Sequence, residues 1–182
     1  MSKQRISNFF RLNSELFNKN YVDAVKLASA DSIHDLRVSY KRLNALVSLL
    51  NFDNSSNYRI RKNFKHLKRV FKAAASLRDF QVLEDLIVHY QQYKDLQLGK
   101  ISAYIKKLKE ESLKEFLSNA KDFNSLAISR LFGIIENHLK NLDEFQVEEQ
   151  FSAFKNQHVL LLEKFSDPLS DKYNLHSANK FA

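Results

Sequence analysis

Glycine and proline are scarce in this chain, and their scarcity limits what it can fold into. Only 2 glycines and 1 proline occur among its 182 residues. Tight turns between the strands of a sheet usually need one of these residues, so a sheet of many strands is hard to build here. We therefore predict an all-α fold. Hydrophobic residues make up 44% of the chain, which is enough for a packed core in one domain over residues 1–182.

Apolar spacing and turn residues divide the chain into helices. The clearest start is predicted at Ser32, because Ser32 and Asp35 have the spacing of a capping box. The sequence NFDNSSN at 51–57 predicts a turn, since its polar side chains can bond to their own backbone. The predicted helices cover 6–17, 21–29, 32–50, 58–77, 78–93, 100–120, 125–142 and 144–165. Residues 6–29 and 58–93 could each form one continuous helix.

Positive charge is concentrated in the first part of the chain. The net charge is +8, and residues 1–79 contain 16 Lys and Arg against 6 Asp and Glu, whereas residues 80–182 contain 13 against 15. Such asymmetry indicates an anionic partner: a nucleic acid, an anionic membrane surface or a phosphate polymer. A basic protein with no specific partner is the alternative.

Two predicted helices carry rows of positive charge without interleaved acids. At about 100° of rotation per residue, each row lies away from the apolar face of its helix. The first row is His34, Arg37, Lys41, Asn44 and Ser48, with Arg42 on its flank. The second row is Arg61, Lys65, Lys68 and Lys72, flanked by Lys62 and Arg69. Like charges one turn apart repel by about 0.2–0.5 kcal/mol per pair, and we expect a bound polyanion to offset this cost.

His34 shares its row with Arg37 and Lys41. A bound phosphate would favour the protonated form of this histidine. We therefore predict that anion binding is coupled to protonation of His34 and tightens below about pH 6.5.

Two segments resemble the CHAD domains, the conserved-histidine α-helical domains. The string IHDLRVSYKRL at 33–43 is similar to the family's opening signature, and SLRDFQV at 76–82 is similar to a second motif that follows a basic helix. The resemblance implies two helical bundles with a basic groove between them, and binding of inorganic polyphosphate. The ligands it implies are His34, Arg37, Lys41, Arg42, Lys65, Lys68, Lys72 and Arg78. Polyphosphate-processing enzymes and polyphosphate granules are the partners it implies.

The same resemblance divides the chain unequally. Residues 1–165 match an antiparallel first half that resembles a four-helix bundle. Residues 166–182 match only the start of a second half, an incomplete one. The chain is then expected to be a fragment, a truncated and non-functional product, or a half-domain. As a half-domain it could pair its basic face with a second copy in a homodimer.

Enzyme motifs are missing from the sequence. It has no glycine-rich phosphate loop, no HExxH and no cysteine nucleophile, and Ser39 lacks a third group to complete a triad with His34. We expect no catalytic residue, no cofactor and no metal. Nucleic-acid binding stays open, although neither charged row carries an aromatic residue for stacking on bases. The absence of cysteine, of a signal peptide and of a long apolar run predicts a cytoplasmic protein that is not inserted in a membrane.

Overall fold

All the elements that the structure describes are α-helices. The computed structural model describes residues 3–50, 58–94, 98–121, 125–145, 148–149, 151–156 and 159. Its named helices are α1 (Lys3–Leu27), α2 (Ala30–Leu50), α3 (Tyr58–Lys94), α4 (Gly99–Lys121) and α5 (Ser125–Asn141), and the described residues of 144–159 are also helical. The predicted all-α fold is confirmed for this part of the chain. The turn predicted at 51–57 and the second-half start at 166–182 lie outside the described residues.

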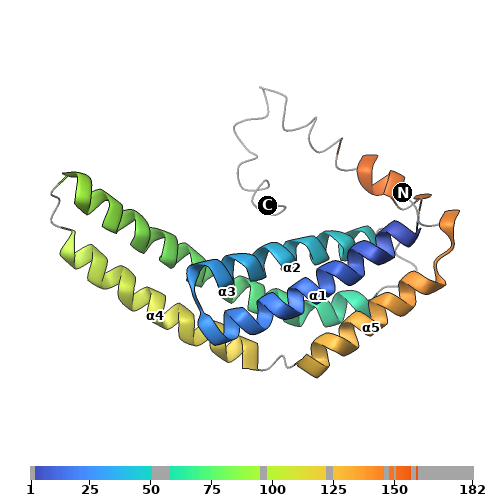
Figure 1. Cartoon of the computed structure of the whole chain (residues 1–182), viewed down its shortest axis with the longest axis horizontal. Coiled ribbons are helices and arrows are strands. Elements are labelled where there is room, and N and C mark those ends of the chain that lie inside the picture. The colour runs from blue at the N-terminus through green and yellow to red at the C-terminus, as the bar shows by residue number, and fades with distance from the viewer. Residues whose placement is uncertain are drawn as a thin grey trace.

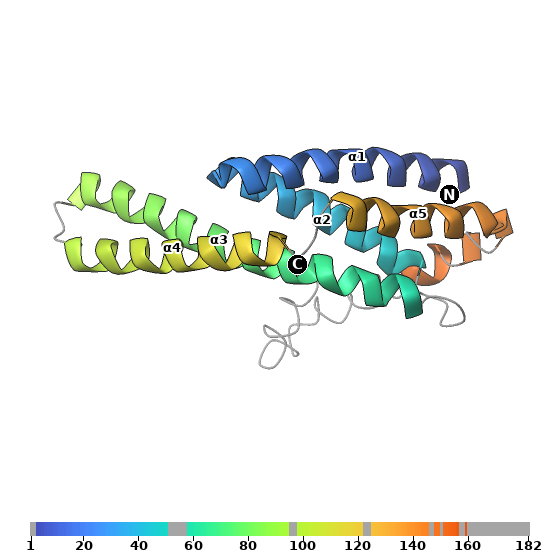
Figure 2. The ribbon, with the colours of Figure 1, turned by 90° about the horizontal axis from the view of Figure 1, so that it is seen from below.

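Four helical segments lie side by side, and a pair of helices extends away from them. From α1 to α4 each helix runs antiparallel to the one before it, and α5 continues in the general direction of α4, antiparallel to α1 and α3 (Figures 1 and 2). Helices α1, α2, the first part of α3 and α5 form one bundle. The second part of α3 leaves this bundle and packs against α4. We call residues 79–94 of α3 and 99–115 of α4 the arm. Helices α1 and α3 are each continuous, as the sequence allowed.

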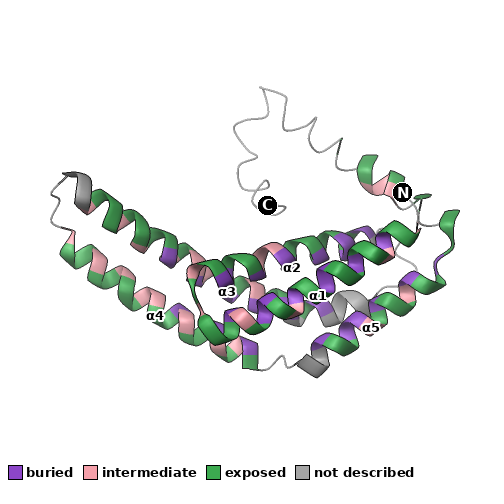
Figure 3. Cartoon of the chain, in the orientation of Figure 1, coloured by how far each residue is buried: buried purple, intermediate pink, exposed green. Residues whose placement is uncertain are grey.

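Aromatic contacts hold α1 against α5 in the core. The ring of Phe132 on α5 meets Phe10 and Phe17 of α1 edge-on, at centroid distances of 5.8 Å and 5.9 Å. The Tyr21 hydroxyl donates a 2.6 Å hydrogen bond to the carbonyl of Ala120, which ties α1 to the end of α4. Figure 3 shows the buried residues on the inward sides of the bundle helices. Each large apolar side chain buried in this way contributes roughly 1.5–3 kcal/mol.

The corner between α1 and α2 differs from the predicted capping box. Helix α2 begins at Ala30, and the Ser29 hydroxyl accepts a 3.2 Å hydrogen bond from the amide of Ser32. The prediction of Ser32 as the N-cap is therefore wrong, because Ser29 offers the same hydroxyl one turn earlier. Ala28 has a positive φ of 48°, the left-handed conformation that ends many helices. The Gln81 side chain of α3 donates a 3.0 Å hydrogen bond to the Ala28 carbonyl, so this corner is fixed against α3.

Candidate functional site

Aromatic stacking sets how α2 and α3 lie against each other. The ring of Tyr40 stacks on Phe71 at 4.3 Å and on Phe64 at 5.4 Å. Tyr40 thus sits between two turns of α3, and Arg37 lies level with Phe71. Because the helices are antiparallel, Lys41 comes opposite the region of Lys68.

The two charged rows lie on the same side of this helix pair. At about 100° per residue, the row on α2 is turned by roughly 60° from the side that meets α3, and the row on α3 by roughly 80° from the side that meets α2. Seen from the N-terminus of each helix, both rows are turned in the same direction. Because the two helices run antiparallel, this places both rows on the same side of the pair. We call this the cationic face, and define it by His34, Arg37, Lys41, Lys65, Lys68 and Lys72.

No ion pair is described for the cations of this face, and Asp79, near Arg37, is the acidic group whose charge acts on one of them. His34, Lys41, Lys65, Lys68 and Lys72 are exposed. The described ion pairs lie elsewhere: Arg11–Glu15, Lys107–Glu111, Lys109–Glu84 and Lys140–Glu136. Helix α4, whose sequence mixes lysine and glutamate, takes part in two of these pairs. The cationic face is therefore a surface of unbalanced charge and not an ordinary solvated helix surface.

Three of the predicted residues fall outside the face as defined, namely Arg42, Arg61 and Arg78. Arg42 is exposed and lies about 120° around α2 from the middle of its row, so it is not part of the shared face. Arg61 belongs to α3, but its side chain lies outside the described residues.

Arg37 and Arg78 form the most unusual part of the site. The guanidinium carbon of Arg37 lies 5.3 Å from the centre of the Phe71 ring, a cation–π distance. Burial lowers the pKa of Arg37, the charge of Asp79 raises it and the charge of Arg78 lowers it again, so these three groups lie close together. One terminal nitrogen of each arginine, Nη1, is buried and has no hydrogen-bond partner.

Both arginines are half-buried with Nη1 turned inward, so an anion satisfies these nitrogens when it draws the guanidinium groups toward the surface. A buried donor without an acceptor costs about 1–3 kcal/mol, and more when it carries charge. Asp79 makes no ion pair with Arg37 or Arg78 among the described contacts, so it does not supply the missing acceptor. The planar guanidinium group suits phosphate oxygens in particular, because it can donate two parallel hydrogen bonds. The site therefore offers two guanidinium groups near exposed lysines, an arrangement whose chemistry suits an anionic group.

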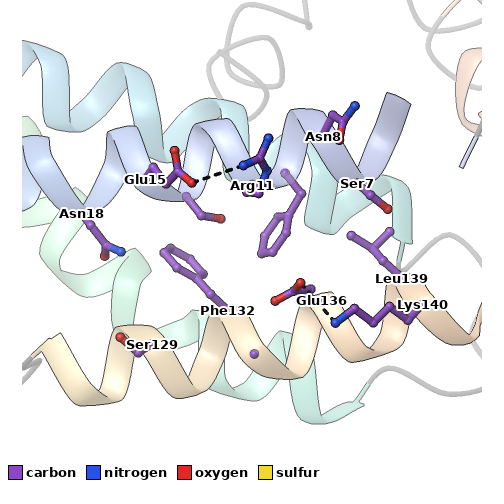
Figure 4. Close-up of a pocket in the computed structure, with 13 residues that line it drawn as sticks. Ser7, Asn8, Arg11, Glu15, Asn18, Ser129, Phe132, Glu136, Leu139 and Lys140 are labelled. Atoms are coloured by element: carbon purple, nitrogen blue, oxygen red, sulfur yellow. Dashed lines mark ion pairs between the residues drawn. The ribbon is translucent and has the colours of Figure 1, made fainter. Parts of the chain in front are cut away.

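A separate cavity between α1 and α5 has a different character (Figure 4). Its volume is about 400 Å³ and none of the predicted site residues lines it. Its charged side chains are balanced, since Arg11 pairs with Glu15 at 4.0 Å and Lys140 with Glu136 at 3.3 Å. A polyanion would meet as much negative as positive charge there.

Metal-binding clusters and membrane-spanning helices are absent from the described residues. Those residues contain no group of three or more His, Cys, Asp or Glu side chains that could hold a metal ion, and no helix long and apolar enough to cross a membrane. Ser39 is fully buried and its hydroxyl donates to the carbonyls of Asp35 and Leu36. Its position therefore suits a structural role in α2.

Comparison with known proteins identifies the family. The model of the CHAD domain matches residues 13–164. The chain belongs to the CHAD family. No curated protein and no solved structure matches it. The CHAD match includes both motifs and every predicted ligand, from His34 to Arg78.

Two contacts of the candidate site were not predicted from the sequence. The ring of Phe71 lies beneath the guanidinium group of Arg37, a contact that the sequence did not indicate. Gln81, inside the second CHAD motif, was given no role, yet it fixes the corner that precedes α2. The period of the hydrophobic residues marks both as inward-facing, but it does not say which polar group each one contacts.

Proposed function

We propose that this CHAD protein binds inorganic polyphosphate on the cationic face and does not act on it as an enzyme. The observation that carries the proposal is the pair of buried, unpartnered nitrogens of Arg37 and Arg78, near exposed lysines that make no ion pair among the described contacts. A chain of linked phosphates offers acceptor oxygens at short, regular intervals. One phosphate can satisfy the arginines while its neighbours neutralise lysines farther along the face.

The residues of the face favour binding of a flexible polyanion over recognition of nucleic-acid bases. Its exposed residues are lysines and a histidine, whereas the aromatic rings of Tyr40 and Phe71 stack on each other between the helices, with Phe71 beneath Arg37. Proteins that hold single-stranded nucleic acid usually stack bases on exposed aromatic side chains. The absence of cysteine from the chain is compatible with a reducing cytoplasm as the place of binding.

A competition titration tests the proposal. Labelled long-chain polyphosphate is bound to the protein at one near-physiological salt concentration, and unlabelled polyphosphate, tRNA and duplex DNA are added as competitors. We expect unlabelled polyphosphate to displace the label at a lower concentration of phosphate groups than tRNA or duplex DNA does. If tRNA or duplex DNA displaces the label at lower phosphate concentrations, the protein is a nucleic-acid binder and the proposal is wrong.

A second measurement addresses catalysis. The protein is incubated with polyphosphate and Mg²⁺, and free orthophosphate is measured with time. We expect no release above the protein-free control. Release that depends on protein concentration, and that persists after further purification, would contradict the non-catalytic part of the proposal.

A further inference from the structure

The arm exposes large apolar side chains, and beyond its base no other helix of the described residues lies beside it in Figures 1 and 2. These side chains are Val82, Leu83, Leu86 and Tyr90 on α3 and Ile101 and Tyr104 on α4, each between 38% and 61% exposed. In the views of Figures 1 and 2, the arm extends beyond α1, α2 and α5, and Figure 3 shows exposed residues along both of its helices. An exposed apolar surface of this extent on a folded protein usually marks an interaction site.

These side chains gather on one face of the arm. Helices α3 and α4 meet through Ser76 and Ser112, whose hydroxyl oxygens are 3.2 Å apart, and through the Lys109–Glu84 pair. The apolar row on α3 is turned by roughly 110° from the side of α3 that meets α4, and the row on α4 by roughly 80° from the side that meets α3. Seen from the N-terminus of each helix, both rows are turned in the same direction. Since the helices are antiparallel, both rows lie on the same side. Val88, which is 49% exposed, is turned in the other sense and lies on the opposite side.

Charge along the arm runs from basic to acidic. Lys100 lies beside the tip, whereas Asp79 and Glu111 lie toward the base, and all three are exposed. Two arms packed in the same direction would bring like charges together. Two arms packed in opposite directions would bring the tip lysine of each toward the acidic base of the other.

The dimensions are sufficient for a specific contact. About 16 residues per helix at 1.5 Å each give a face roughly 24 Å long, and two helices of about 10 Å diameter make it roughly 20 Å wide. Two such faces would cover about 1,000 Å² in total, the lower bound for a specific interface. The pair would be a four-helix bundle with a closed apolar interior.

We propose that the arm face is a homodimer interface, occupied by the arm of a second copy of this chain in antiparallel, twofold arrangement. A twofold axis across the arms leaves the two bundles at opposite ends, so each cationic face stays open. The arrangement therefore differs from a dimer that pairs its basic faces. It does not depend on polyphosphate binding, and either proposal can fail without the other.

Cysteine cross-linking tests this arrangement at one residue. The chain has no native cysteine, so a single introduced thiol reports only on its own position. Leu86 is at the middle of the row from Val82 to Tyr90, so the twofold axis brings it next to its symmetry mate. We expect Leu86→Cys to form a disulfide-linked dimer under mild oxidation. The matched control Val88→Cys, two residues away on the opposite side, is expected to stay monomeric on a non-reducing gel.

Light scattering after gel filtration gives the second test. The wild type and Val88→Glu are expected to elute as dimers, and Leu86→Glu as a monomer with unchanged circular dichroism and unchanged polyphosphate affinity per chain. A monomeric wild type, or equal cross-linking of the two cysteine variants, would overturn the proposal. If Leu86→Glu loses its helical signal, the cross-linking of Leu86→Cys and Val88→Cys decides between the outcomes, because both cysteine variants are measured as folded proteins.

Discussion

Replacing Arg37 with methionine should weaken anion binding without weakening the fold. Methionine keeps an apolar side chain of similar length over Phe71 and removes the charge. A hydrogen bond to a charged group contributes about 1.5–3 kcal/mol. At 1.4 kcal/mol per factor of ten, loss of this bond should reduce polyphosphate affinity by about 10- to 150-fold.

The same Arg37→Met substitution should increase stability, although it weakens anion binding. In the free wild-type protein, the buried guanidinium nitrogen without a partner costs about 1–3 kcal/mol of stability. The substitution removes this cost. The lost cation–π contact, 5.3 Å from ring centre to guanidinium carbon, is worth about 0.5–1 kcal/mol. A sulfur–aromatic contact replaces part of it, at about 0.3–1.5 kcal/mol. We expect the free energy of unfolding to rise by about 2 kcal/mol.

Urea denaturation and polyphosphate titration of the same preparations measure both quantities. Lys107→Met on α4 is the matched control, because the Lys107 side chain is exposed and lies 3.9 Å from Glu111. It should change neither quantity beyond about 0.5 kcal/mol. An Arg37→Met protein that is less stable but binds as tightly as wild type would show that Arg37 is a structural residue, and would refute the reasoning.

Three further predictions concern other parts of the molecule. Lys68→Ala should reduce the slope of log affinity against log salt concentration by roughly one, since one fewer phosphate is neutralised. The control Lys107→Ala should leave the slope unchanged. Equal slopes for both variants would show that Lys68 is not part of the site. Ala28→Gly should raise the unfolding free energy by about 1 kcal/mol in urea denaturation, because alanine is strained at a φ of 48°, and a loss of stability would contradict that strain. Burial raises the pKa of Tyr40 to about 12, so the stability from its neutral phenol is complete below about pH 10 and lost as the pH rises to about 12. Tyr40→Phe should therefore keep more of its stability than wild type between those pH values, and a parallel decline of the two proteins would contradict this assignment.

The helices and the candidate ligands could be predicted from the sequence because both depend on local periodicity. Scarce glycine and proline argued against a sheet of many strands. Leu36, Leu43 and Val47 follow the period of a helix, and all three are buried on one side of α2. The cap at Ser29 was missed because two serines three residues apart can each cap a helix. Only the packing of the corner against Gln81 distinguishes them.

The arrangement of the site could not be predicted in the same way. Periodicity places Arg37 and Lys68 each on one side of a helix, but it does not say whether the two sides coincide. That depends on the direction and register of packing, which the stacking of Tyr40 on Phe71 sets. The partnerless nitrogens of Arg37 and Arg78 also depend on packing, since they are buried only after α2 and α3 meet.

Mapping the bound polymer onto the backbone tests the central claim most directly. Amide resonances of labelled protein are followed by NMR during titration with polyphosphate of defined length. We predict the largest shifts in residues 34–41 of α2 and 65–78 of α3, with little change in the residues around the α1–α5 cavity. Shifts concentrated at that cavity or on α4, with the Arg37 and Arg78 amides unchanged, would contradict the account.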